Sequence, residues 1–493
     1  MTLRLFNTLS GQIDELAPSD GKALRMYACG PTVYDYGHIG NFRTFLQIDV
    51  LRRFLKLTGM HMRHVMNITD VDDKIIRNAA QAGIPIGKYT PRFVDAFFED
   101  LDSLRIERPE QIARATEHIP RMVELVQKLA AIGAAYQTDD GSWYFRLASF
   151  PEYGKLSKKD LSGMEDGARV DVDEYEKDSA RDFALWKAAK PGETAWDTAI
   201  GRGRPGWHIE CSAMAMEYLG DSFDLHAGGE DLMFPHHENE IAQSESVTHK
   251  PFARHWMHVR FLLVDGRKMS KSEGNFFTLR DLLLKGYKAS AIRLALISVP
   301  YRHQLNFTFD GLIEATNAIE RLRTFHQRLV KGVYAQGENS QLQAAAKEAR
   351  TEYMAALAND LNTAEARGAP IFDLIRAANT AIDKGQLYSG DREAILGVLA
   401  SFDAVFDVIE DHDAEPTKRA LAWAEKEGRL ADVAPELLVR QSLSDEAIDA
   451  LVAERTLAKK QRNFARADQI RNELAEKGVV IEDAKDGARW KRK

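Results

Sequence analysis

A short apolar segment that runs into a glycine-containing loop and then a long amphipathic helix limits the possible folds more than any other feature. Residues 25–29 form the apolar segment, Gly30-Pro31 breaks regular structure, and residues 41–59 have apolar side chains at helical spacing. Residues 61–69 then predict a second strand. A strand, a helix and a strand in this order predict a parallel sheet with a right-handed crossover.

The rest of the chain divides into regions of different pattern. Residues 112–135 have helical spacing, and the following residues, to about 200, have shorter periods, which predicts an insertion into the first domain. Residues 201–206 are rich in Gly and Pro, so we expect an irregular loop that leads into a helix near Trp207. Strand-like pieces return over 224–262 and complete the sheet. After about residue 310 the pattern is almost entirely helical.

Composition excludes several classes of protein. Among 493 residues, 44% are hydrophobic and 28% are charged, which is a globular balance. We find no apolar run long enough to span a membrane, and the start of the chain lacks the pattern of a signal peptide. Two cysteines are too few for a secreted disulfide scaffold. We therefore expect a cytoplasmic protein of about three domains.

The charge distribution is uneven along the chain. The formal net charge is -8, which excludes a uniformly basic nucleic-acid coat. Residues 451–493 nevertheless contain 12 Lys or Arg and 7 Asp or Glu. This basic tail fits a polyanionic partner, although a solvated amphipathic helix has the same composition.

Two loops contain residue types that bind phosphate. Residues 29–41 join the first strand to the helix, and they combine glycines with His38 and Asn41 at a helix N-terminus. Lys268-Met-Ser-Lys271-Ser272 places two lysines and two hydroxyls where they can hold a triphosphate and balance the charge of a leaving pyrophosphate. Each motif alone is also typical of an ordinary turn. Both together, in this order, indicate a nucleotide site.

Four scattered residues have the chemistry of a zinc site. His236 and Glu240 are four residues apart and share one face of a predicted helix, Cys211 lies upstream, and Cys29 ends the first strand. Two thiolates, an imidazole and a carboxylate suit a tetrahedral zinc ion. Spacing alone favours a surface helix and two core cysteines over a metal site. Residues 224–231 also predict a turn, with paired glycines before an acid that could bind a ribose or an amino group.

These segments together resemble the cysteinyl-tRNA synthetases, a family of class I aminoacyl-tRNA synthetases, essentially from end to end. The most specific matches are Cys29-Gly-Pro-Thr-Val-Tyr-Asp, His38-Ile-Gly-Asn41, Asn67-Ile-Thr-Asp-Val-Asp-Asp-Lys74, Gly203-Arg-Pro-Gly-Trp-His-Ile-Glu-Cys211, Asp231-Leu-Met-Phe-Pro-His-His-Glu-Asn-Glu240 and Lys268-Met-Ser-Lys-Ser272.

The resemblance implies an α/β Rossmann-type catalytic domain with an inserted connective domain, followed by an all-α helical bundle and a small C-terminal anticodon-binding domain. The implied boundaries are 1–119 and 201–262 for the catalytic domain, 120–200 for the insertion, 263–315 for a stem-contact region with the KMSKS loop, 316–418 for the bundle and 419–493 for the anticodon-binding domain.

The resemblance further implies a reaction and its cofactors. L-cysteine would be activated with ATP to cysteinyl-adenylate and transferred to the 3′ end of tRNA(Cys), by a monomer without membrane attachment. One zinc ion per chain would select the substrate thiol, because a thiolate is a soft ligand and a serine hydroxyl is not. Mg2+ is expected with ATP. The alternatives are a cysteine–amino-sugar ligase of thiol biosynthesis and a catalytically decayed RNA-binding module.

Roles for individual residues are implied by the same resemblance. The zinc ligands would be Cys29, Cys211, His236 and Glu240. The catalytic residues would be His38, Asn41, Lys268 and Lys271. ATP would contact Gly30, Thr32, His38, Gly40, Asn41, Asp231, Lys268, Ser270 and Lys271. Cysteine would contact Thr69, Trp207 and His226, although Trp207 fits a core position equally well. The tRNA would contact Arg489, Trp490, Lys491 and Arg492, where unpaired bases can stack.

Overall fold

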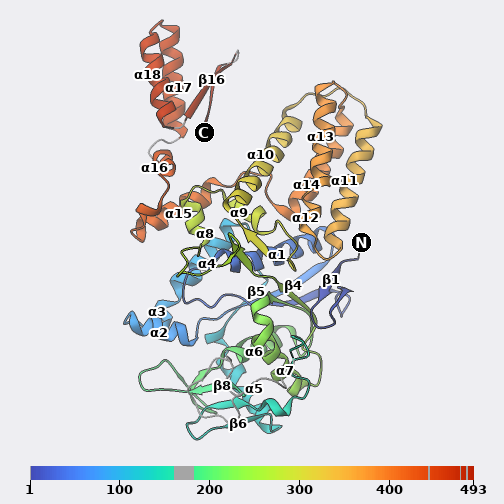
Figure 1. Cartoon of the computed structure of the whole chain (residues 1–493), viewed down its shortest axis with the longest axis vertical. Coiled ribbons are helices and arrows are strands. Elements are labelled where there is room, and N and C mark those ends of the chain that lie inside the picture. Colours follow the sequence, from blue (N-terminus) through green and yellow to red (C-terminus); the bar gives the residue numbers. More distant parts are fainter. Residues whose placement is uncertain (1, 160–181, 442–444, 478, 485–486, 493) are drawn as a thin grey trace. The chain divides into compact units, whose positions relative to one another are not determined.

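The computed structural model describes residues 2–159, 182–441, 445–477, 479–484 and 487–492 (Figure 1). These residues form two compact units. One contains Met1–Thr278 and Ser290–Asp411, and the other contains Leu279–Ala289 and His412–Lys493. None of the helices among the described residues is long and apolar enough to cross a membrane.

A five-stranded parallel sheet organises the first unit. Its strand order is β12-β11-β3-β4-β5. The strands are β3 Ala23–Ala28, β4 His61–Ile68, β5 Gln111–Arg114, β11 Phe223–Gly229 and β12 Ala253–Val259. The order runs outward from β3 through β4 to β5 on one side and through β11 to β12 on the other. The strand order therefore reverses between β3 and β11, and ligands of such sheets bind at the carboxyl ends of the strands at this point.

Helix α1, Ile39–Leu57, connects the first two strands of this sheet, as the sequence predicts to within two residues. The His38 side chain caps the N-terminus of α1 by accepting a hydrogen bond from the Asn41 backbone, and the Asn41 side chain accepts one from the His38 backbone. The two predicted phosphate-binding residues therefore form the cap that begins the helix. Gly59 takes a φ of +81° just after its end. The parallel sheet and the predicted strand at 61–69 are confirmed.

The edge strand β5 corrects one sequence prediction. Residues 111–114 form a strand that pairs with Val65–Ile68, so the helix predicted over 112–135 is confined to α5, Ile119–Ala131. Pairing with a neighbouring strand overrides local helical spacing here. A second correction concerns residues 224–231, where the predicted turn is wrong for most of the segment. Strand β11 continues to Gly229, and only Glu230–Leu232 turn.

A second, antiparallel sheet lies between the two halves of the parallel sheet in the sequence. Its order is β6-β7-β8-β10-β9, and its strands are β6 Ala135–Gln137, β7 Trp143–Phe145, β8 Phe183–Ala188, β9 Trp196–Thr198 and β10 Gly201–Pro205. The irregular loop predicted at 201–206 is wrong, because β10 pairs with strands on both sides. A Cβ on Gly203 would lie 2.3 Å from the Lys187 carbonyl oxygen, so glycine permits this close strand approach.

Smaller sheets and further helices complete the half of the first unit that contains the parallel sheet. The hairpin β1 Arg4–Asn7 and β2 Gln12–Glu15 is antiparallel. A three-stranded sheet has the order β14-β13-β15, with β13 Leu262–Val264, β14 Arg267–Lys268 and β15 Leu305–Phe307. The remaining helices of this half are α2 Asp73–Gln81, α3 Ile86–Tyr89, α4 Pro91–Ser103, α6 Trp207–Leu219, α7 Glu238–Thr248 and α9 Ala289–Leu296.

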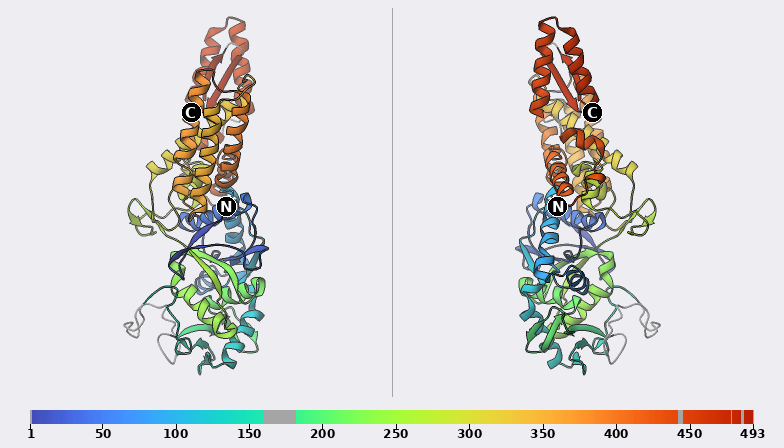
Figure 2. Two further views of the ribbon diagram at one scale, coloured as in Figure 1. Left: turned by 90° about the vertical axis from the view of Figure 1, so that its right-hand side faces the viewer. Right: turned by 90° about the vertical axis from the view of Figure 1, so that its left-hand side faces the viewer.

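The helical region predicted after residue 310 forms a bundle in the first unit. Helices α10, α11, α13 and α14 lie side by side in Figures 1 and 2. The bundle helices are α10 Phe309–Lys331, α11 Ser340–Ala358, α12 Thr363–Ala366, α13 Ala369–Asp383 and α14 Ser389–Phe406. Their apolar faces bury residues such as Leu322, Tyr353 and Phe402.

The second unit contains mostly helices and one hairpin. Helix α8 packs against α15, and Arg429 of the following segment pairs with Asp281 at 2.9 Å. A small apolar cluster joins α17, α18 and the antiparallel hairpin β16-β17. The elements are α8 Leu279–Leu284, α15 Ala414–Lys426, α16 Pro435–Gln441, α17 Asp445–Lys460, α18 Phe464–Glu476, β16 Val479–Ala484 and β17 Gly487–Arg492.

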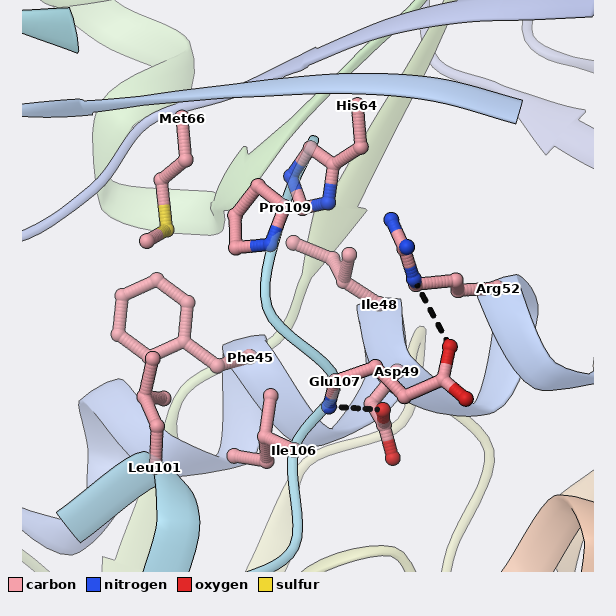
Figure 3. A pocket seen from close by; sticks show the side chains of 10 residues that line it. All are labelled: Phe45, Ile48, Asp49, Arg52, His64, Met66, Leu101, Ile106, Glu107 and Pro109. Carbon is pink, nitrogen blue, oxygen red and sulfur yellow. Dashed lines mark hydrogen bonds and ion pairs between the residues drawn. The ribbon is translucent and has the colours of Figure 1, made fainter. Parts of the chain in front are cut away.

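A small pocket lies within the first unit between α1, β4 and α4 (Figure 3). Its wall is mostly apolar, and His64 from β4 points into it. His64 is 5% exposed, and neither ring nitrogen has a hydrogen-bond partner among the described residues. Such a buried, unpaired imidazole is favoured only in its neutral form.

Candidate metal centre and nucleotide site

The four predicted zinc ligands come together at the point where the strand order of the parallel sheet reverses. Cys29 directly follows β3, Cys211 lies on α6, His236 lies in the turn before α7, and Glu240 lies on α7. One ligand atom from each residue lies within 4.8 Å of all the others, and all four side chains are buried. Residues more than 200 positions apart therefore form one compact donor set.

Cys211 and Glu240 favour the ionised forms that bind zinc, whereas Cys29 and His236 would each release a proton on binding it. Burial raises the pKa of Cys29 well above its usual range, and Glu240 and Cys211 raise the pKa of His236 to about 10 against the effect of burial. Burial opposes ionisation of Cys211, but hydrogen bonds from Cys29 and His236 lower the pKa of Cys211 to about 6. Burial of Glu240 is likewise outweighed by His226 and His236, which lower the pKa of Glu240 to about 2. One oxygen of Glu240 lies 3.0 Å from Nε2 of His236. Thiolate, imidazole and carboxylate donors at this spacing fit a tetrahedral zinc ion.

Two further histidines surround the same carboxylate and thiol. Nε2 of His226 lies 2.9 Å from the other oxygen of Glu240, and Nε2 of His237 lies 3.4 Å from Sγ of Cys29. Cys29, His226, His237 and Glu240 form a second group close enough to hold a metal ion. Sequence reasoning assigns no role to His237, although the adjacent pair His236-His237 is a usable signal.

A chain of hydrogen bonds holds these histidines in place. Nδ1 of His237 lies 2.8 Å from Nε2 of His258, whose Nδ1 lies 2.8 Å from Oγ1 of Thr8. The ring of His226 stacks on Trp256 at 4.5 Å between centroids. Partners of this kind set ring orientation and tautomer around a metal centre. His226, a predicted cysteine contact, is fully buried here and contacts Glu240 directly.

The other predicted cysteine contacts lie beside the donor set. The ring of Trp207 stacks on His236 at 4.2 Å between centroids and is half-buried, so it walls one side of the metal centre. Oγ1 of Thr69 donates to Glu210 at 3.1 Å and accepts from the Asn67 amide at 3.0 Å. Burial raises the pKa of Glu210 well above its usual range. Sequence reasoning misses Glu210, although it immediately precedes the predicted ligand Cys211.

The first nucleotide loop, Gly30 to Asn41, begins directly after Cys29. A Cβ on Gly30 would lie 1.8 Å from the carbonyl oxygen of Asn67, so only glycine fits there. Thr32 pairs with Thr69 in an isolated parallel bridge. The loop therefore runs beside Thr69, one of the predicted cysteine contacts, before it reaches the start of α1.

His38 and Asn41 each use one polar atom in the helix cap. Nδ1 of His38 accepts from the Asn41 backbone at 3.2 Å, and Oδ1 of Asn41 accepts from the His38 backbone at 3.0 Å. This leaves Nε2 of His38 and Nδ2 of Asn41 for a ligand. A Cβ on Gly40 would lie 2.9 Å from the His38 ring. Burial lowers the pKa of His38, so the ring is neutral at pH 7.

The KMSKS loop begins at the last residue of β14, and hydrogen bonds within the loop hold its shape. The Asn275 side chain accepts from Ser270 N–H at 2.8 Å and donates to the Lys268 carbonyl at 3.1 Å. Nζ of Lys271 lies 2.6 Å from Oδ2 of Asp35 in the first loop, and this contact raises the pKa of Lys271. Sequence reasoning assigns no role to Asp35, although Asp35 ends the motif Cys29-Gly-Pro-Thr-Val-Tyr-Asp.

The start of α1 and the end of the KMSKS segment are also joined through the backbone. Ile39 N–H donates to the Phe277 carbonyl at 3.0 Å, and His38 bridges Thr278. Asp231 follows β11, and its carboxylate folds back over Gly229, where a Cβ would lie 2.4 Å from it. The first nucleotide loop and Asp231 thus follow the carboxyl ends of β3 and β11, and the KMSKS segment contacts the first loop and the start of α1.

The predicted tRNA contacts lie on β17 in the second unit. Nε1 of Trp490 donates to Asp449 at 2.7 Å, and its ring packs against the apolar cluster of α17, α18 and β16. Arg489 is exposed. The side chains of Lys491 and Arg492 lie outside the described part of the structure. A role of these four residues in tRNA binding stays a prediction.

Comparisons with known proteins identify matching families along the chain. A model of the class I (C) tRNA synthetase catalytic domain matches residues 15–318, a DALR domain model matches 352–409, and a model of the cysteinyl-tRNA ligase anticodon binding domain matches 443–490. The chain is 59% identical to the cysteine–tRNA ligase of Koribacter versatilis (strain Ellin345), with all of both chains covered. It is 53% identical to that of Solibacter usitatus (strain Ellin6076), again with all of both chains covered.

A solved structure supports the fold. Methionyl-tRNA synthetase of Mycobacterium tuberculosis in complex with methionyl-adenylate matches with a TM-score of 0.59 and 16% identity, covering 81% of this chain and 93% of that one. At this identity the likeness concerns the fold alone, which confirms the predicted Rossmann-type class I architecture with a helical C-terminal part. On the strength of the catalytic-domain match and the full-length relatives, the chain belongs to the cysteinyl-tRNA synthetases, the cysteine–tRNA ligase family of class I.

Proposed function

We propose that this chain is a cysteine–tRNA ligase that activates L-cysteine with ATP and transfers the cysteinyl group to the 3′ end of tRNA(Cys). One observation carries the proposal. Four zinc-type donors, buried and within 4.8 Å of one another, lie at the carboxyl ends of the strands, where the first nucleotide loop begins. This arrangement supports a thiol-binding centre next to a phosphate-binding loop.

Cys29, Cys211, His236 and Glu240 would hold the zinc ion. Bound there, zinc would supply a soft ligand position for a substrate thiolate, which a serine hydroxyl does not occupy well. Trp207, which stacks on His236, would restrict the size of a substrate side chain beside the metal centre. His226 holds one oxygen of Glu240, so the other oxygen stays directed toward His236. Thr69 and Glu210 supply polar groups for the amino-acid backbone.

The first step joins the cysteine carboxylate to ATP. A carboxylate oxygen attacks the α-phosphorus in line, the bond to the β-phosphate oxygen breaks, and pyrophosphate leaves with the bonding electrons. Nε2 of His38 and Nδ2 of Asn41 would donate to phosphate oxygens at the N-terminus of α1. Asp231 would contact the ribose. We expect Mg2+ to accompany ATP.

The lysine loop would respond to the charge of the leaving group. Lys271 pairs with Asp35 in the structure, and Lys268 is exposed. A pyrophosphate carries more negative charge than one carboxylate, so it would draw Lys271 away from Asp35 as the α–β bond breaks. Ser270 would donate a further hydrogen bond. This exchange of partners concentrates stabilisation in the transition state.

The second step transfers the cysteinyl group to tRNA. A hydroxyl of the terminal ribose attacks the adenylate carbonyl, a proton leaves that hydroxyl, and AMP departs. The basic tail and the anticodon-binding match at 443–490 support recognition of the tRNA by unpaired bases and phosphates. We propose the domain boundaries given above, a monomer, and a cytoplasmic location in which both cysteines stay reduced; both are free thiols in the structure.

A cysteine–amino-sugar ligase would need similar loops and a similar metal centre. The DALR and anticodon-binding matches beyond the catalytic half favour the tRNA substrate instead. The intact lysine loop and the complete donor set disfavour a decayed RNA-binding module.

Cysteine-dependent ATP–pyrophosphate exchange tests the proposal directly. Purified protein should exchange pyrophosphate with cysteine and ATP, lose this activity with a chelator, recover it with zinc, and activate serine several orders of magnitude more weakly. Charging of tRNA(Cys), compared with ligation of cysteine to an amino sugar, separates the two enzymes. Equal activity with serine, or undiminished activity in metal-free protein, would contradict the role of zinc.

A further inference from the structure

Arg43 is a fully buried arginine on α1, in the helix that directly follows the first loop of the nucleotide site. It is 0% exposed and lies two residues after Asn41, within the first turns of the helix. Burial lowers the pKa of Arg43 to about 10, so the guanidinium still carries its charge at pH 7. A buried charge destabilises the fold unless several hydrogen bonds compensate for the lost water.

The hydrogen bonds that Arg43 makes among the described residues go to backbone carbonyls. Nε donates to Arg260 at 3.0 Å, at the end of β12. The two terminal nitrogens donate to Leu296 at 3.3 Å, Pro300 at 3.4 Å and His303 at 2.6 Å. One planar group thus binds two separate segments of the chain, one at the sheet and one in residues 296–303. Only the five-donor fork of arginine has this reach.

Gln47 extends this contact by one turn of the same helix. It is fully buried, and its side-chain nitrogen donates to the Val299 carbonyl at 3.2 Å. The i, i+4 spacing places Gln47 and Arg43 on one face of α1. This face of the helix therefore holds residues 296–303 against the start of α1 by a row of carbonyl contacts.

Residues 296–303 lead directly to the base of the KMSKS loop. They precede β15, which pairs in parallel with β13, and β13 pairs with β14 through Leu263 and Lys268. Lys268 is the last residue of β14 and the first of the KMSKS motif. Hydrogen bonds, together with the short backbone segment from His303 to Leu305, thus join Arg43 to the strand from which the lysine loop emerges.

We propose that Arg43 is a positioning residue for adenylate formation, which fixes the base of the lysine loop relative to the phosphate-binding start of α1. The proposal rests on the roles proposed above for His38, Asn41, Lys268 and Lys271. Arg43 itself does not contact the substrates. It sets the separation across which His38 and Lys271 act on the same triphosphate, and the chemistry is sensitive to that separation.

Arg43→Ala tests this role in cysteine-dependent ATP–pyrophosphate exchange. We expect kcat to fall about 100-fold, as for a displacement of about 1 Å, while the KM for cysteine and the zinc content stay unchanged. Guanidinium chloride at non-denaturing concentration should restore part of the lost turnover by filling the vacated position, and methylammonium should not, because it lacks the planar fork. Arg43→Lys should remain impaired for the same reason.

Arg52→Ala is the matched control. Arg52 lies on the same helix, but its partners are Glu107 and Glu110, away from both loops. It should keep wild-type kcat and show no response to guanidinium. Gln47→Leu removes a single carbonyl contact and should lower kcat about fivefold, the effect of one hydrogen bond.

Two results for the Arg43 variants would overturn the proposed role of this residue. Folded Arg43→Ala with wild-type kcat overturns the proposal, and so does a loss that guanidinium does not restore. If Arg43→Ala does not fold, the kcat values of Arg43→Lys and Gln47→Leu test the role of Arg43 instead. Wild-type kcat in both variants overturns the proposal. His38→Ala is measured in parallel, because full activity in that variant would refute the proposed nucleotide site rather than the role of Arg43.

Discussion

Replacing His64 with leucine should remove one defined part of the acid sensitivity of the first unit, the part that comes from this imidazole. His64 points into the small apolar pocket of Figure 3 among Phe45, Ile48 and Leu101. Burial, together with the charge of Arg52, lowers the pKa of His64 to about 3. Leucine fits the apolar wall and cannot titrate, so His64→Leu isolates the effect of this one imidazole.

The size and direction of the effect follow from the two protonation equilibria. In the unfolded chain His64 has a pKa of about 6.5, so it takes up a proton below that pH, whereas the folded chain resists protonation down to about pH 3. The unfolded state therefore gains protons first, and stability is lost as the pH falls through this window. Between pH 7 and pH 5 the loss from His64 amounts to about 2 kcal/mol, since each pKa unit corresponds to about 1.4 kcal/mol.

Urea unfolding of wild type and His64→Leu at pH 7 and pH 5 measures this quantity as a difference of differences. Other buried histidines titrate in both proteins and cancel. We expect the wild type to lose about 2 kcal/mol more than His64→Leu on acidification. The histidine pKa can be read independently by NMR on labelled protein. Equal losses in the two proteins, or a measured pKa near 6.5 for His64, would refute the reasoning.

The remaining predictions concern the proposed site. Elemental analysis should find one zinc ion per chain, and Cys211→Ser should impair cysteine activation far more than ATP binding, measured by exchange and by calorimetry; equal losses would argue against a thiol-selective metal. Lys271→Ala should lower the rate of adenylate formation about 100-fold in a rapid-quench assay with unchanged cysteine affinity, and an unchanged rate would exclude its role. Deletion of residues 443–493 should spare pyrophosphate exchange and impair tRNA charging, because the α8–α15 contact remains intact; loss of both activities would contradict a separate anticodon domain.

The local elements of the catalytic half are predictable because each has a strong local signal. Helix α1 and strand β4 follow from hydrophobic spacing and the glycine loop, which predict both to within two residues. The irregular loop expected at 201–206 is wrong for the opposite reason. Strand β10 has no β-type composition, and it exists because β8 and β9 provide hydrogen-bond partners on both sides.

The sequence by itself determined which chemical groups are present: two cysteines, a His–Glu pair at helical spacing, and two loops with phosphate-binding residues. Zinc and phosphate chemistry depend on residue type, so these candidates follow from the order of residues alone. Only the tertiary structure determined which other side chains contact these groups. His237, Glu210, Asp35 and Arg43 lie far in the chain from the groups they contact, and strand order and helix packing bring them together. Residue type is local information, whereas a shared hydrogen bond between distant segments depends on the whole fold.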